Sequence, residues 1–193
     1  APFRENQFGI AVGGPIRKDK TFYFGNYEGF RVRRQETFVV SVPLPNHLKG
    51  NFAGEAPVTD PGSGSPFPNN VIPETRISTW GKVFRDLFPA PNSSTFPNLN
   101  TTNKYTRDQD QFTTRIDHNF SAKDQLYGRF IFANDDQLRP EFVQLKTGNI
   151  SPLHSRNLAI HETHVFSPTW VNVATFGYSH ILRDTVREPF DRD

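Results

Sequence analysis

The chain has 193 residues, enough for one domain with a sizeable core, and its 22 basic and 20 acidic residues leave a net charge of +2. The charges are spread along the chain without a basic block, so we expect no nucleic-acid partner. The absence of cysteine excludes a disulfide framework, a thiolate metal site and a cysteine nucleophile, and no apolar stretch is long enough for a transmembrane helix.

The composition combines a low apolar share with many aromatic side chains. Hydrophobic residues make up 35% of the chain, yet it contains 19 Phe, 5 Tyr and 2 Trp, and its mean hydropathy is negative. A strand with one face in lipid and the other in water needs this combination, although a soluble β-sandwich could show it too. Neither a signal peptide nor a methionine is present, so we expect a processed product or an excised segment of a longer protein.

In chain order, six strand-like runs form three pairs that are joined by short turns. We predict hairpins over about 7–32, 111–134 and 157–180. Each run has about ten residues, the length that a tilted strand needs to cross a bilayer. Gly13-Gly14-Pro15 is expected to end the first strand, because proline cannot continue a hydrogen-bonded ladder.

The run from 111 to 120 shows the clearest alternation. Phe112 and Ile116 fall on one face of this predicted strand, and Arg115 and Asp117 fall on the other. In the next run, Arg129 lies opposite the apolar residues of its strand. We expect Arg115, Asp117 and Arg129 to line the polar face together, where charge pairs stabilise strand register.

Long connections, over about 35–110 and 135–156, separate the hairpins. The first is rich in Pro, Gly, Asn and Ser, and a helix is predicted within it over about 77–88, with Thr75 or Ser78 as its cap and Pro89 as its stop. A connection this long usually has a binding or lid role or is partly disordered. Trp80, Phe84 and Phe88 of this helix mark the candidate ligand-binding region.

Alternation of short and long connections is typical of outer-membrane barrels, whose short turns face the periplasm and whose long loops face the outside. The predicted fold is therefore all-β, with antiparallel up-and-down strands from a transmembrane-type barrel and one short helix in a long loop. A soluble antiparallel sheet with uneven loops is the alternative.

A resemblance supports the barrel. The run over 6–29, NQFGIAVGGPIRKDKTFYFGNYEG, is similar to a stretch early in the barrel of Oar-like TonB-dependent receptors, which carry a carboxypeptidase-regulatory-like domain at the N-terminus. Further similar segments follow in order at 68–73 (PNNVIP), 110–118 (DQFTTRIDH), 123–129 (KDQLYGR) and 163–169 (THVFSPT). They are scattered over nearly the whole chain with plausible spacing.

The resemblance implies a fragment of the early barrel of a transporter in the bacterial outer membrane, which takes up a nutrient such as a siderophore, glycan or peptide. Its implied partners are outer-membrane lipid and the remainder of the parent barrel and plug. Six strands cannot close a barrel of that family, and we expect the plug, the energy-coupling box and the regulatory-like domain to lie outside residues 1–193.

The sequence offers no catalytic constellation, and we expect no enzyme, no cofactor and no metal. His161 and His164 lack the spacing of a zinc motif, and in a strand they point to opposite faces. Asp108, Asp110 and the cluster Asn134-Asp135-Asp136 could bind Ca²⁺ from outside, but solvated charges at loop bases are the favoured interpretation.

A second hypothesis is structural. A six-stranded piece exposes two unpaired edges, each of which is a template for an identical copy. Strand addition that does not close produces an open fibre, so the alternative function is a subunit of a β-rich filament or other homo-oligomer at the cell surface, assembled from cleaved receptor fragments.

Overall fold

The structure, a computed structural model, describes residues 2–141 and 148–187. Its elements in chain order are β1 (Phe3–Arg17), β2 (Thr21–Val40), α1 (Pro45–Leu48), α2 (Thr79–Leu87), β3 (Leu99–Asn119), β4 (Asp124–Arg139), β5 (Asn149–Ser167), β6 (Trp170–Arg183) and β7 (Val186–Arg187). The connection between β2 and β3 also contains two 3-10 turns, Pro68–Asn70 and Glu74–Arg76.

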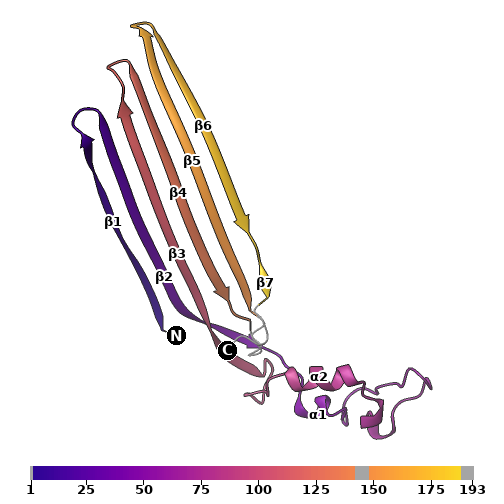
Figure 1. Cartoon of the computed structure of the whole chain (residues 1–193). Helices are drawn as coiled ribbons and strands as arrows, with labels where there is room; N and C mark the ends of the chain where they lie inside the picture. Colours follow the sequence, from indigo (N-terminus) through magenta and orange to yellow (C-terminus); the bar gives the residue numbers. More distant parts are fainter. Residues whose placement is uncertain (1, 142–147, 188–193) are drawn as a thin grey trace. The chain divides into compact units, whose positions relative to one another are not determined.

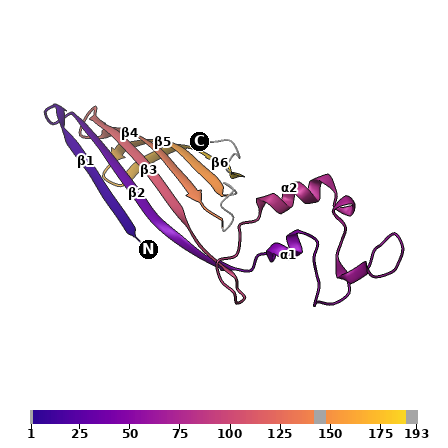
Figure 2. The same ribbon diagram turned by 90° about the horizontal axis from the view of Figure 1, so that it is seen from below.

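The strands form one antiparallel sheet in the order β1-β2-β3-β4-β5-β6, and the short β7 pairs with β5. Each strand lies beside its neighbours in the sequence, with three tight turns at one end of the sheet (Figures 1 and 2). Because neighbouring strands run in opposite directions, short turns can join them and no crossover connection is needed. The predicted all-β, up-and-down fold is confirmed.

The strands are longer than the predicted runs of about ten residues. They contain between 14 and 21 residues from β1 to β6, so the first connection shrinks to 41–98, and β4 and β5 extend to Arg139 and back to Asn149. The added lengths lie mostly at the ends away from the tight turns, where polar residues occupy both faces and no alternation marks a strand. Backbone pairing with the neighbouring strand extends the ladder there, and such pairing is not visible in local sequence.

The expected strand end at Pro15 is not observed, because β1 continues to Arg17. Pro15 still pairs with Phe22, and the register shifts between Pro15 and Arg17. The proline lies at an edge strand and beside an irregularity, which are the positions where a missing backbone N–H is tolerated. The turn that follows contains Asp19 with a φ of 60°, a conformation that Asp tolerates better than most residues.

The chain divides into two compact units. One holds the strands over 2–35, 104–140 and 148–187, and the other is built on residues 36–103. In the second unit, Val42 and Leu99 are buried, and Asn98 is only 1% exposed. Few large apolar side chains are buried in this unit, so polar contacts contribute much of its order.

Asparagine side chains join distant backbone segments of this second unit. Asn98 accepts a hydrogen bond from the Val42 amide at 2.7 Å and donates to the Val42 carbonyl at 2.9 Å. Asn70 accepts from the Val58 amide at 2.7 Å and donates to the Phe52 carbonyl at 2.6 Å. Because an amide side chain carries both a donor and an acceptor, each asparagine satisfies backbone groups as a neighbouring strand would.

Helix α2 lies within the predicted range and begins after Ser78, whose hydroxyl accepts a hydrogen bond from the Gly81 amide at 3.0 Å. Ser78, and not Thr75, is therefore the cap. Pro89 follows one residue after Phe88, the C-cap. The single-turn helix α1 was not among the predicted elements. None of the helices within the described parts of the chain has the length and apolar character that a membrane span requires.

Replacing Asn98 with alanine should loosen the unit over 36–103. The substitution leaves the Val42 amide and carbonyl buried without partners, which should cost about 2–4 kcal/mol of local stability. Hydrogen exchange on the full-length protein should show faster exchange over this unit and unchanged exchange in β4 and β5. The exposed Asn46→Ala in α1 is the control, and equal exchange in both variants would contradict the role of Asn98.

Candidate functional site

The two faces of the sheet differ in chemistry. Residues that pair across strands share a face, and the registers place one set of apolar side chains together. This apolar face contains Phe8, Ile10, Val12, Tyr27, Phe112, Ile116, Leu126, Phe130, Phe132, Leu158, Ile160, Phe176 and Tyr178. Nearer the tight turns the same face also carries His118, Glu162, His164 and Asn172. Ile10 is 71% exposed and Phe176 is 59% exposed. A single-layer sheet leaves these side chains without a covering layer of protein.

A row of polar residues ends the apolar face. Each residue lies between nine and eleven residues from the turn end of its strand: Asn6, Arg31, Asp110, Asn134, Arg156 and His180. We call this row the polar belt. A strand tilted by about 40° rises about 2.5 Å per residue, so ten residues span about 25 Å, the height of the apolar band on a membrane barrel.

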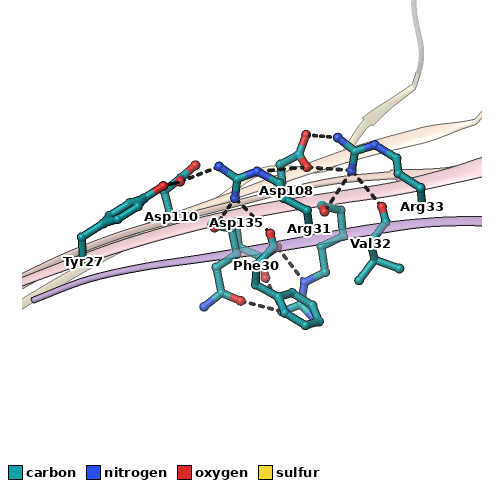
Figure 3. A network of polar contacts seen from close by, with 10 residues as sticks. Tyr27, Phe30, Arg31, Val32, Arg33, Asp108, Asp110 and Asp135 are labelled. Atoms are coloured by element: carbon teal, nitrogen blue, oxygen red, sulfur yellow. Dashed lines mark hydrogen bonds and ion pairs between the residues drawn. The ribbon is translucent and has the colours of Figure 1, made fainter. Parts of the chain in front are cut away.

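Ion pairs neutralise the charges of the polar belt on β2 and β3 (Figure 3). Arg31 Nη2 lies 2.6 Å from Asp110 Oδ1, and the Tyr27 hydroxyl donates to the same oxygen at 2.6 Å. One step further from the turns, Arg33 contacts both oxygens of Asp108, at 2.7 and 2.8 Å. The carboxylates therefore act as partners of β2 arginines and join β2 to β3.

The opposite face is polar and also contains charge pairs. Its members include Gln7, Asn26, Glu28, Gln111, Thr113, Arg115, Asp117, Tyr127, Arg129, Asn157, His161, Thr163 and Thr175. We call it the wet face, although it also carries the apolar residues Phe22, Phe24, Phe30, Ile131, Val171, Val173 and Ile181. Arg107 forms hydrogen bonds with both oxygens of Asp135, at 2.9 and 2.6 Å, and its guanidinium lies 5.5 Å from the centre of the Phe30 ring.

The three charged residues predicted to share the polar face do so. Arg115 and Arg129 are direct register partners, and Arg115 Nη2 lies 2.5 Å from Asp117 Oδ1. The predicted charge pair across neighbouring strands is wrong for Arg115. Its ion-pair partner Asp117 lies two residues further along the same strand, β3. The Arg115 guanidinium also lies 3.8 Å from the centre of the Tyr127 ring, which stacks on His161. These contacts order the wet face and leave its polar groups accessible.

The candidate ligand-binding residues all lie on α2 or at its end. Trp80 is 73% exposed, Phe84 59% and Phe88 41%. Their spacing of four places them on one side of the helix, together with Val83. We call Trp80, Phe84 and Phe88 the aromatic side of α2.

The polar residues of α2 are held by the rest of the connection. Arg85 Nη1 lies 3.3 Å from Glu74 Oε1, and Lys82 Nζ lies 3.5 Å from the same oxygen. Arg85 donates hydrogen bonds to Asp86 and to Glu74. Both raise the pKa of its guanidinium, and the bond to Asp86 has the larger effect. The helix thus turns its charges toward Glu74 and leaves its aromatic rings in solvent, the reverse of a helix on a soluble core.

The histidines of the 161–164 segment are separated by the sheet. His161 stacks on Tyr127 on the wet face, whereas His164 contacts Asp124 on the other face. Within the described residues, no group of three or more side chains of the metal-binding kinds is close enough to hold an ion. Asp108, Asp110 and Asp135 each contact an arginine. These carboxylates are therefore more than solvated charges at loop bases.

Sequence reasoning missed the arginines Arg31, Arg33 and Arg107. A signal was present, since Arg31 and Arg33 share one face of their strand, as Asp108 and Asp110 do on theirs. The two pairs are more than 70 residues apart in sequence, however, and only the sheet order brings them together.

An antiparallel sheet of long strands with one largely apolar face and one largely polar face is typical of the walls of membrane β-barrels. The comparison with family models agrees, because the model described as "Outer membrane beta barrel domain" matches residues 1–193. The chain therefore belongs to this family and to the bacterial outer membrane. Searches of curated proteins and of solved structures found no match.

Family membership assigns the two faces. The apolar face contacts membrane lipid, and the wet face lines the interior, as in barrels of this class. In barrels of this class, short turns face the periplasm and long loops face the outside. The polar belt marks the end of the lipid-covered surface that lies away from the tight turns.

The Arg31–Asp110 pair should stabilise the contact between β2 and β3. In a double-mutant cycle with Arg31→Gln and Asp110→Asn, we expect a coupling free energy of about 1–2 kcal/mol, since both side chains are partly exposed. Unfolding of the full-length protein from lipid vesicles in urea measures it. The matched comparison is Arg115 with Asp117, which lies within one strand and should couple by about 0.5 kcal/mol or less. Equal coupling in the two cycles would overturn the assignment.

Proposed function

We propose that the chain supplies wall strands and one large outer loop of a TonB-dependent transporter that takes up a nutrient such as a siderophore, glycan or peptide. Three features support the proposal: the resemblance over nearly the whole chain, the polar residues of the wet face, and the long connection between β2 and β3. The proposal assigns transport, and no chemical reaction, to the protein.

The open sheet implies further partners. The β1–β6 sheet has two edge strands, and an edge in a bilayer must be paired because lipid offers no hydrogen bonds to backbone groups. We propose that the remainder of the parent barrel pairs with β1 and β6 and that a plug contacts the wet face. Phe22 and Phe24, which lie on that face, fit contact with a plug better than contact with a water-filled lumen.

The aromatic side of α2 is the observation that carries the ligand proposal. Aromatic rings bury large areas and stack on planar or ring-shaped ligands, which suits sugars, catechol groups and aromatic peptides. Three such rings lie on one side of a helix whose Lys82 and Arg85 contact Glu74, and all three rings are exposed. A ligand that covers them recovers the free energy of burying exposed apolar surface.

Alanine substitution at Trp80, Phe84 and Phe88 should weaken capture of the nutrient. Loss of each ring should reduce affinity by about tenfold, since a well-packed aromatic contact contributes more than 1 kcal/mol. Uptake is measured in cells that use the full-length protein as importer, with a panel of labelled ferric siderophores, oligosaccharides and peptides. Deletion of the connection should abolish binding, and uptake should stop when the inner-membrane energy source is removed.

Phe96→Ala is the control for these variants. Phe96 is 62% exposed in the same connection but lies outside α2. We expect its removal to leave uptake within about twofold. If Phe96→Ala and Trp80→Ala reduce uptake equally, or if neither does, the aromatic side of α2 is not the capture surface.

The second candidate is assembly of identical copies by strand addition. The observation that favours it is the pair of unpaired edges at β1 and β6 in the part of the chain that the structure describes. In this alternative, the 193-residue fragment forms a β-rich filament or ring at the cell surface. Electron microscopy and size-exclusion chromatography of the isolated fragment should then show open fibres or rings, and Gln7→Pro on edge strand β1 should shorten them. A monodisperse monomer would exclude this function.

A further inference from the structure

A basic pocket lies on the lipid-facing side of the sheet, just outside the polar belt. We propose that Arg4, Arg33 and Lys104, the basic pocket, bind the phosphate group of an anionic lipid in the outer leaflet. The inference rests on the face of the sheet and on uncompensated charge, and it does not depend on which nutrient the protein transports.

The pocket is a cavity of about 290 Å³ at the junction of β1, β2 and β3. Arg4, Arg33 and Lys104 line it together with Pro2, Tyr105 and Thr106. Arg34 and Gln35 also line the cavity. The Arg34 guanidinium lies 4.2 Å from the centre of the Tyr105 ring, which is only 7% exposed. Four basic side chains line this cavity, and three of them, Arg4, Arg33 and Lys104, belong to the lipid-facing side of their strands. This arrangement suits a ligand that combines negative charge with apolar groups.

The register creates an unfavourable charge arrangement that an anion would relieve. Arg4 and Arg33 are direct partners across β1 and β2, and like charges that lie directly opposite each other destabilise a sheet. Arg33 is paired with Asp108, which Arg31 also approaches at 3.6 Å. Arg4 and Lys104 form no ion pair or hydrogen bond with any residue that the structure describes. The basic pocket therefore carries about two uncompensated positive charges.

The position of the pocket selects a lipid phosphate. On β1, the apolar side chains Ile10 and Phe8 lead along the lipid-facing side to Asn6 in the polar belt and then to Arg4. Apolar chains of a lipid can lie along Phe8 and Ile10 while its phosphate lies beside Arg4, because head groups begin where the apolar band ends. Within the polar belt, Arg31 is neutralised by Asp110, and Arg156 donates hydrogen bonds to the Ala133 carbonyl and to Asn134.

The test is binding of diphosphorylated lipid A to the full-length protein in phosphatidylethanolamine nanodiscs, with the bound lipid counted by native mass spectrometry. Arg4→Gln should lower the affinity about fivefold, and Arg4→Gln with Lys104→Gln about 25-fold, because a basic residue at a membrane surface contributes about 1 kcal/mol. Arg4→Lys keeps the charge and should stay within about twofold. Arg129→Gln, which removes a charge from the wet face, should leave the affinity unchanged.

Two outcomes would overturn the proposal. The first is equal lipid A affinity in wild type and in the double variant, with both proteins folded as judged by the heat-dependent shift of barrel mobility on gels. The second is full displacement of the lipid by millimolar inorganic phosphate, which would identify a site for a free anion. Nutrient uptake is measured separately, so a failure of the transport proposal and a failure of the lipid proposal remain distinguishable.

Discussion

A sheet one layer thick has no interior of its own, and this constraint governs the rest of the molecule. Every backbone group inside the bilayer must pair with a neighbouring strand, because lipid supplies no hydrogen-bonding partners. The apolar face must then be covered by lipid, which explains why Ile10, Ile116 and Phe176 are exposed in a folded chain. The hydrophobic effect acts here between protein and membrane, and the covering layer is not part of the polypeptide.

The polar belt ends the apolar face on the side away from the tight turns. The polar belt crosses all six strands at nearly the same distance from the tight turns, although the strands themselves differ in length. Arg31 and Arg33 are neutralised by Asp110 and Asp108 where the lipid-covered surface ends. Such pairing lowers the cost of placing charges beside an apolar medium. The basic pocket lies beyond the belt, where lipid head groups can provide the missing negative charge.

The connection between β2 and β3 is stabilised by polar contacts. It has few buried apolar side chains, so Asn98 and Asn70 substitute for neighbouring strands by satisfying buried or half-buried backbone groups. Polar anchoring leaves the aromatic side of α2 free of an internal structural role. An ordered loop with unused aromatic rings fits recognition better than a disordered one, because less conformational entropy is lost when a ligand binds.

The chain's own sequence determined the features that depend on near neighbours. Alternation placed Phe112 and Arg115 on opposite faces, and the local spacing of Trp80, Phe84 and Phe88 marked a helix, because strand and helix periods span only a few residues. The tertiary structure alone decided the extension of the strands, the partners of Asp108 and Asp110, and the meeting of Arg4, Arg33 and Lys104. These contacts join residues far apart in sequence, and they depend on strand order and register, which the pairing of whole strands sets.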